Sequence, residues 1–191
     1  MTARLEALPQ IHAHCWQALT QAARQPGHAW RWLALATVAP AGAAGGLPRP
    51  DLRTVVLREA DADARTLVFY TDSRSPKVAQ LRAQAEAMLL AWDPTPGWQL
   101  RLRARLTVET DGLEVSSRWA RLKMHPAAQD YLSPLPPGQP LAGPTPPDRG
   151  TRSHFAVVTA QVEGFDWLEL HRDGHRRACF DAAGQGQWLS P

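Results

Sequence analysis

The residues of this chain best suited to chemistry are cations and hydroxyls at the ends of apolar strands in its middle third. Arg53 and Arg58 flank a largely β-branched run, and Lys77 closely follows a second one. An apolar strand needs no arginine at both ends, whereas a phosphate group is bound by such cations and by hydroxyls. Four blocks follow in order: Arg53-Thr54-Val55-Val56-Leu57-Arg58, Phe69-Tyr70-Thr71, Ser75-Pro76-Lys77 and Gln99-Leu100-Arg101. The ordered set predicts a site for a phosphate-bearing molecule.

Lys77 has the strongest case within these blocks. Ser75 and Pro76 are typical of a helix start, with a hydroxyl N-cap followed by proline at the first helical position. Lys77 therefore falls in the first turn, where a cation opposes the helix dipole. A bound anion would be held there by the dipole, the free N–H groups and the ammonium together. This position favours Lys77 as a phosphate-binding residue.

For the other blocks, the residues alone leave alternatives open. Arg53 and Arg58 are five apart in a strand, so their side chains fall on opposite faces, and one site uses both only if it wraps the strand end. Otherwise they are rim residues in water. Gln99 either faces a heterocycle with its amide or is an exposed polar residue. The arginines on its face of the strand form a solvated or subunit-facing ladder: Arg101, Arg103 and Arg105.

Composition argues against several classes of function. The 21 basic and 18 acidic residues give a net charge of +3, with arginines spread along the chain, which is too little for a nucleic-acid binder. Cys15 and Cys179 are far apart, and the seven histidines lack neighbouring ligands, so we expect neither a disulfide nor a metal site. No apolar run long enough to span a membrane and no signal-peptide pattern occurs, which predicts a soluble, cytoplasmic protein. P-loop, Rossmann and G-x-S-x-G motifs are absent.

The elements that must position these residues are mostly strands. Hydrophobic periodicity predicts helices over 11–24 (within an N-terminal segment 1–28), 75–85 and 113–124. The predicted strands are 30–38, 52–58, 66–71, 88–92, 98–109, 155–162, 165–170 and 176–180. Seven prolines among residues 134–147 predict a loop, whose bounds we set at 132–151.

This order of elements indicates the fold class. Six or more strands with two or three short helices, which do not alternate regularly, favour a mainly antiparallel barrel with helices packed outside. The expected class is therefore mainly β (α+β), with six to eight antiparallel strands and short flanking helices. A chain of 191 residues fits a single domain, which we expect over 1–191.

On this background, the four blocks resemble the flavin-binding blocks of the pyridoxamine 5′-phosphate oxidase family, and the ending Trp188-Leu189-Ser190-Pro191 resembles that family's usual ending. The resemblance covers most of the chain, from about Trp30 to the end. It implies an FMN-binding split β-barrel that works as a homodimer, with FMN at the subunit interface. Ser75 and Lys77 would lie at the phosphate and Gln99 at the isoalloxazine ring. The full set of implied cofactor-binding residues is Arg53, Thr54, Val55, Val56, Arg58, Tyr70, Thr71, Arg74, Ser75, Lys77 and Gln99.

The sequence departs from the family pattern mainly in the substrate half. Where the family usually has lysine and arginine, this chain has Arg58 and Pro76, and Arg74 beside the latter would restore the charge. In the vitamin B6 oxidase, a tyrosine, an arginine and a serine grip the substrate phosphate. The corresponding positions here are Arg118, Leu122 and Pro126, and the family's C-terminal Arg-Leu-His-Asp-Arg block is replaced by His175-Arg176-Arg177-Ala178-Cys179. Arg118 and Arg177 remain as candidate substrate residues, and the catalytic residues are unknown.

The resemblance therefore implies an FMN-dependent oxidoreductase related to that oxidase rather than the vitamin B6 enzyme itself. Hydride would pass from a small substrate to FMN, with reoxidation by oxygen. Two alternatives stay open. A split barrel could bind haem or another tetrapyrrole, with His154 or His175 as axial ligand. The protein could also be a non-catalytic flavin-binding sensor that contacts a partner through its proline-rich loop.

Overall fold

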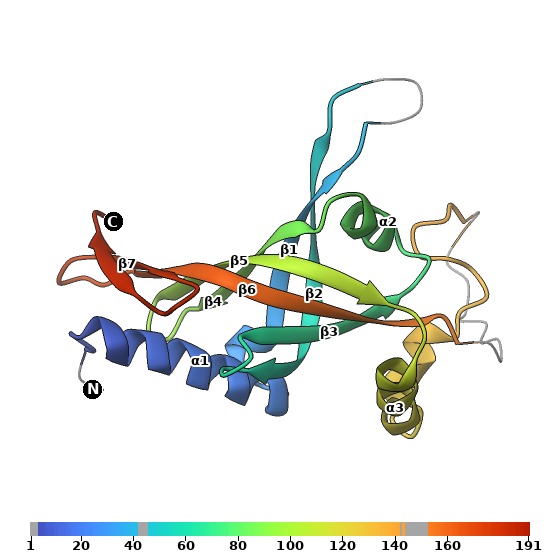
Figure 1. Cartoon of the computed structure of the whole chain (residues 1–191), viewed down its shortest axis with the longest axis horizontal. Coiled ribbons are helices and arrows are strands. Elements are labelled where there is room, and N and C mark those ends of the chain that lie inside the picture. Colours follow the sequence, from blue (N-terminus) through green and yellow to red (C-terminus); the bar gives the residue numbers. More distant parts are fainter. Residues whose placement is uncertain (1–3, 42–45, 142, 144–152) are drawn as a thin grey trace.

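The computed structural model describes residues 4–41, 46–141, 143 and 153–191. These form an eight-stranded antiparallel sheet in the order β3-β2-β1-β4-β5-β6-β7-β8 (Figure 1). A further pairing of β3 with β6 closes the first six strands into a barrel. The strands are β1 (Trp32–Ala39), β2 (Arg49–Asp61), β3 (Thr66–Asp72), β4 (Glu86–Asp93), β5 (Trp98–Glu109), β6 (Phe155–Glu169), β7 (Arg176–Asp181) and β8 (Gly186–Leu189). The mainly β, antiparallel class predicted from the sequence is confirmed.

Alternating side chains fill the barrel. In β5 the residues at even positions from Trp98 to Leu106 point inward, and those at odd positions point outward. The inward residues join a core that includes Leu33, Leu57, Phe69 and Trp167. Burial of this apolar surface is the main term that stabilises the fold.

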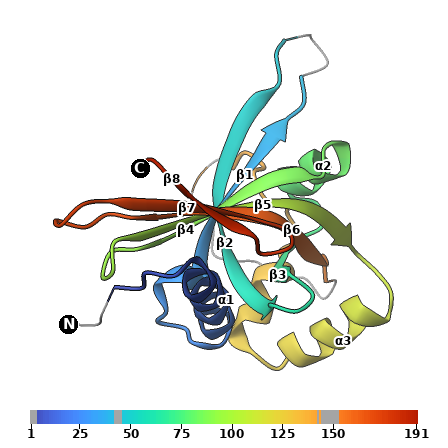
Figure 2. The same ribbon diagram turned by 60° about the vertical axis from the view of Figure 1, so that its left-hand side comes forward.

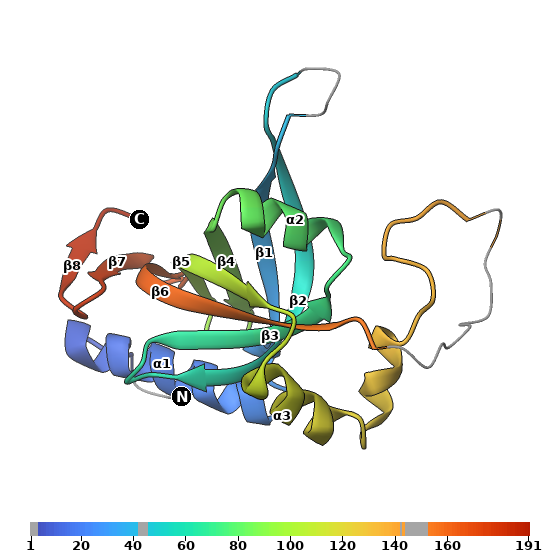
Figure 3. The same cartoon turned by 45° about the vertical axis from the view of Figure 1, so that its right-hand side comes forward.

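In the part of the chain that the structure describes, three α-helices and two short 3₁₀ helices pack around the barrel: α1 (Leu8–Arg24), η1 (Ala29–Arg31), α2 (Pro76–Ala83), α3 (Leu113–Leu122) and η2 (Pro126–Tyr131). Figure 3 shows α1 along one side of the barrel and α3 near the start of β6. It also shows α2 beside the arm that the end of β1 and the beginning of β2 form together. The arm itself projects well beyond the barrel (Figure 2). A second apolar cluster, which contains Val115, Tyr131 and Phe155, lies between α3, η2 and the outer side of β3 and β6. Within the described residues, none of the helices is both long and apolar enough to cross a membrane.

The C-terminal half corrects two sequence predictions. Residues 155–162 and 165–170 were predicted as separate strands, but they form one strand, β6. Gly164 has a φ of 155°, and the pairing with β5 shifts its register beside it, so this glycine produces a bulge rather than a turn. The short strand β8 was not predicted, because only its pairing with β7 makes it regular. The predicted loop over 132–151 is described up to 141 and at 143, and its other residues lie outside the described part.

Glu169 of β6 ties the segment before α1 to the start of β7 and to β5. Its buried carboxylate accepts hydrogen bonds from Arg176 at 2.9 and 3.0 Å, from Arg4 Nε at 2.9 Å and from Trp98 Nε1 at 3.2 Å. Burial alone would raise the pKa of Glu169, but these hydrogen bonds more than reverse the effect and hold it below its ordinary value. The ionised carboxylate is therefore favoured by folding.

We expect Glu169→Gln to lower the free energy of unfolding at pH 7 by about 1–3 kcal/mol, because charged hydrogen bonds are replaced by weaker ones. A carboxyl group with a depressed pKa contributes stability that is complete above its unfolded-state pKa and is lost as the pH falls through the folded-state value. Urea titrations at pH 7 and below pH 4.5, the ordinary value, measure this. The wild type should approach the variant in stability at the lower pH, and a constant difference between them would contradict the assignment.

Candidate functional site

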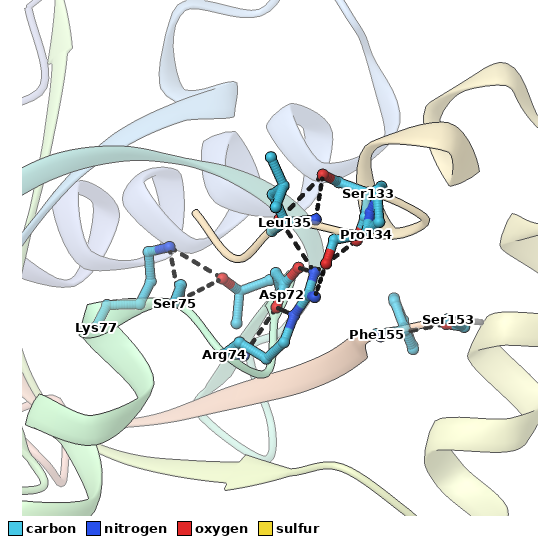
Figure 4. A network of polar contacts seen from close by, with 10 residues as sticks. Asp72, Arg74, Ser75, Lys77, Ser133, Pro134, Leu135, Ser153 and Phe155 are labelled. Atoms are coloured by element: carbon cyan, nitrogen blue, oxygen red, sulfur yellow. Dashed lines mark hydrogen bonds and ion pairs between the residues drawn. The ribbon is translucent and has the colours of Figure 1, made fainter. Parts of the chain in front are cut away.

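Lys77 lies at the start of α2 with two hydroxyl partners from the preceding strand and turn (Figure 4). Its Nζ donates to Thr71 Oγ1 at 3.0 Å and to Ser75 Oγ at 3.2 Å, and the two hydroxyl oxygens are 3.3 Å apart. Ser75 is the N-cap residue by position, as predicted, but its hydroxyl makes no capping bond. That hydroxyl lies beside the ammonium instead, so the helix start, the cation and both hydroxyls converge.

The charge of Lys77 is poorly compensated. Burial and the charge of Arg53 lower the pKa of Lys77. Among the described residues it makes no ion pair, and the two carboxylates that act on it at longer range, Asp51 and Asp72, each pair with an arginine. A partly buried ammonium with hydroxyl partners and no carboxylate is suited to an added anion.

Gln80 is a buried polar residue of this site that sequence reasoning missed. Its Oε1 accepts from Thr37 Oγ1 at 2.6 Å and from Arg53 Nη2 at 2.8 Å, while its Nε2 donates to Asp51 Oδ2 at 2.8 Å. One side chain therefore joins α2 to both β1 and β2. The available signal was a glutamine next to Leu81 on the inward side of a short helix.

Arg53 takes part in the same network from the inner face of β2. Besides Gln80, its guanidinium pairs with Asp51 and donates to Thr37 and to the carbonyl of Leu35. Arg53 is linked to Lys77 in two ways. It bonds to Gln80 of α2, the helix that also carries Lys77, and its positive charge acts on the Lys77 ammonium. The structure thus brings Arg53, Thr71, Ser75 and Lys77 together at one end of the barrel.

Arg74 lies in the same turn, but its guanidinium points at protein acceptors (Figure 4). It pairs with Asp72 through Nη2 at 2.7 Å and donates to the carbonyls of Ser133 and Pro134. The prediction that Arg74 restores the charge of the missing arginine at position 76 therefore competes with a second role, which is to hold residues 133–135.

The run between Arg53 and Arg58 alternates across the sheet. Val55 is buried in the barrel core. Thr54 and Val56 lie on the outer face, opposite Ala34 and Trp32 of β1. Only outer-face residues of this run can offer side chains to a ligand outside the barrel.

Arg58 and Tyr70 form a second group, beside α3. The Arg58 guanidinium lies 5.7 Å from the centre of the Tyr70 ring, and the Tyr70 hydroxyl donates to Glu59 at 3.0 Å. Burial and the neighbouring Glu59 carboxylate raise the pKa of Tyr70 to about 12. Arg118 donates to the same carboxylate at 2.9 and 2.8 Å. Arg118 and Tyr70 therefore share one acid as their partner.

Gln99 and Arg177 lie in one cross-strand row on the outer face of the sheet, on either side of Leu168. Arg177 pairs there with Asp166. Thr71 of the Lys77 group is opposite Ala156, at the other end of β6. Gln99 is therefore not brought to the Lys77 group within one chain, and Arg177 is not brought to Arg118.

The sequence model for pyridoxamine 5′-phosphate oxidase, FMN-binding domain, matches residues 13–110. That stretch is more than half of the 191 residues and includes all four blocks. The chain belongs to this family. No curated protein matches it in sequence.

Solved structures of the pyridoxamine 5′-phosphate oxidase fold resemble the whole chain. A pyridoxamine 5′-phosphate oxidase-related, FMN-binding protein from Nostoc punctiforme is 25% identical, with 98% of each chain covered and a TM-score of 0.70. PhzG from Burkholderia lata, in complex with tetrahydrophenazine-1-carboxylic acid, is 21% identical over 96% of this chain and 92% of its own, with a TM-score of 0.66. A heme-binding protein from Mycobacterium smegmatis is 16% identical over 96% of this chain and 61% of its own, with a TM-score of 0.52. The last two likenesses show the fold alone.

The residues present fit the FMN of the pyridoxamine 5′-phosphate oxidase family at the phosphate end. Lys77, Ser75 and Thr71 supply one cation and two hydroxyls, and among the described residues no carboxylate forms an ion pair with the ammonium. His175, one of the two candidate haem ligands, is less suited to that role. His175 is exposed and its Nδ1 accepts from the amide of His171. In the described part of the chain, no group of three or more metal-ligating side chains occurs.

We expect Gln80→Leu to destabilise this family member by about 1–3 kcal/mol, because Thr37, Arg53 and Asp51 lose a shared partner inside the protein. Urea unfolding measures the change. Gln84→Leu, at an exposed position at the end of the same helix, is the matched control and should stay within about 0.5 kcal/mol of the wild type. Equal effects of the two substitutions would show that Gln80 does not anchor α2.

Proposed function

We propose that this protein binds FMN with the phosphate at Lys77, Ser75 and Thr71, and that it is an oxidoreductase related to pyridoxamine 5′-phosphate oxidase. The observation that carries the proposal is the partly buried Lys77 ammonium, which has two hydroxyl partners and no ion pair among the described residues. Family membership supports FMN as the source of the missing anion. Hydride would pass from a small substrate to the flavin, with oxygen as the reoxidant.

The complete site in this proposal is formed by two copies of the chain. Gln99, the candidate partner of the isoalloxazine ring, lies toward the β7 end of β6, while the Lys77 group lies toward the other end. In an isologous dimer, residue i of one copy contacts residue j of the other and the reverse, so two elements that are separated within one chain can meet across the axis. FMN would then contact Lys77 of one copy and Gln99 of the other.

An exposed apolar row suits this second copy. Leu52, Ala36 and Met88 are cross-strand neighbours on the outer face of β2, β1 and β4. Leu52 is 68% exposed and Met88 38%, and the nearby Trp32 is also exposed. Contiguous exposed apolar residues on a sheet face are typical of a protein interface.

In the proposed reaction, FMN supplies the hydride-accepting chemistry, and the protein supplies position and electrostatics. Lys77 and the two hydroxyls hold the phosphate, and Gln80 fixes the helix that carries Lys77. Thr54 and Val56 present a partly apolar outer surface beside which a ring could lie.

Arg118 and Arg177 are neutralised by Glu59 and Asp166, so an anionic substrate would have to compete with these carboxylates. This favours a substrate that differs from a pyridoxamine phosphate.

We expect Lys77→Ala to weaken FMN binding about 10- to 100-fold, because a charged hydrogen bond to the phosphate is lost. Quenching of flavin fluorescence measures the affinity, and riboflavin, which lacks the phosphate, should bind both proteins equally weakly. Since a bound anion would raise the lowered pKa of Lys77, wild-type affinity should fall as the pH rises through the range below 10.5, and the variant should lack this fall.

Absorbance spectra and binding measurements can contradict the proposal. A purified protein that is colourless and does not take up added FMN would refute FMN binding. A Soret band would indicate haem instead. Unchanged FMN affinity in Lys77→Ala would move the phosphate away from this group. A yellow protein whose flavin no amine or nicotinamide donor reduces would support a non-catalytic flavin-binding protein.

The proposal that two copies of the chain form the FMN site is tested separately. We expect Leu52→Asp to shift the protein from dimer to monomer in size-exclusion chromatography with light scattering, because a charge would be buried in the proposed interface. FMN affinity should fall with it. Leu113→Asp replaces an exposed leucine at the start of α3, away from this row, and should leave the dimer intact. A wild-type monomer that binds FMN tightly would refute the two-copy site.

A further inference from the structure

Arg74 makes an unusually complete set of contacts for a residue in a turn. Its Nε and Nη2 donate to the two carboxylate oxygens of Asp72 at 3.1 and 2.7 Å. Nη2 also donates to the carbonyls of Ser133 at 2.8 Å and Leu135 at 3.4 Å, and Nη1 donates to that of Pro134 at 3.0 Å. All three guanidinium nitrogens therefore have protein acceptors, and three of these are consecutive carbonyls (Figure 4).

Asp72 makes this arrangement costly to break. Its side chain is only 5% exposed, and its Oδ1 also accepts from the backbone amide of Arg74 at 2.8 Å. A buried carboxylate that loses its cation is left uncompensated in a low-dielectric surrounding. The planar fork of an arginine can serve the carboxylate and the carbonyls together, which a lysine cannot do.

The same turn is also hydrogen-bonded to the chain just before β6, which follows the proline-rich segment. The amide of Ser73 donates to the carbonyl of His154 at 2.7 Å, and the amide of His154 donates to the carbonyl of Tyr131 at 2.9 Å. The turn between β3 and α2 therefore contacts the chain both before and after this segment. Thr71 precedes the turn and Lys77 follows it, so its conformation sets the spacing of the phosphate-binding group.

We propose that Arg74 is a positioning residue that couples residues 133–141 to the phosphate site. By holding the carbonyls of residues 133–135, it fixes the turn whose neighbours Thr71, Ser75 and Lys77 take the phosphate, and phosphate binding in return orders residues 133–141. The inference rests on the proposed FMN site. Coupling between two sites is reciprocal, so each partner strengthens the other by the same factor.

Arg74→Ala and Arg74→Lys test this coupling, with Arg82→Ala as the control. Arg82 is an exposed arginine near the end of α2, so its removal takes away the same charge without touching the turn. Hydrogen exchange of peptides that cover 131–141 is followed by mass spectrometry, with and without FMN. Affinities for FMN and riboflavin are measured on the same proteins, and circular dichroism melting shows which variants are folded.

We expect FMN to slow exchange over 131–141 in the wild type. Both Arg74 variants should exchange faster there even without FMN, should lose the FMN-dependent protection, and should bind FMN about 10-fold more weakly. Arg82→Ala should behave as the wild type. Should Arg74→Ala not fold, the lysine variant, which keeps the charge opposite Asp72, carries the comparison.

Three results would overturn the inference. Weak FMN binding with wild-type exchange in 131–141 would make Arg74 a direct phosphate ligand. Full rescue by lysine would leave charge alone as its role. FMN binding by both variants at wild-type affinity would remove the coupling. A wild type that fails to bind FMN refutes the proposed function instead, and it removes the phosphate partner from the coupling.

Discussion

The pairing of β3 with β6 is the interaction on which the rest of the molecule depends. Seven residue pairs, from Thr66 opposite Gln161 to Asp72 opposite Phe155, close the sheet into a barrel and leave neither strand as a free edge. The same ladder brings the turn after β3 beside the chain that enters β6. The Lys77 group, the Arg74 contacts and the second apolar cluster all lie next to this closure.

Closure has an electrostatic consequence. Side chains at the end of the barrel are partly withdrawn from water, where a charge without a partner is costly. Arg53, Arg74 and Arg118 each meet this cost with a nearby carboxylate, from Asp51, Asp72 and Glu59. Lys77 makes no ion pair among the described residues, and burial and the charge of Arg53 lower its pKa. This difference is the reason for proposing a binding site rather than a stabilising network at Lys77.

Several features were predictable from the sequence because they depend on local pattern. Strict alternation from Trp98 to Glu109 defined β5, and its bounds agree with the structure. Ser75 and Pro76 predicted the start of α2, and helical spacing predicted α1. The two strands predicted on either side of Gly164 are one strand, β6. A glycine in a sequence is compatible with either a turn or a bulge, so the sequence could not distinguish the two.

The sequence by itself determined the barrel class, the order of the four blocks and the position of Lys77 at a helix start, since each follows from the spacing and type of nearby residues. Only the tertiary structure decided which charges are already paired. Gln80 of α2 bonds to three residues on two strands, β1 and β2, and Arg74 contacts residues about sixty positions later in the chain. Such contacts depend on how distant segments approach one another, and no local pattern records that approach.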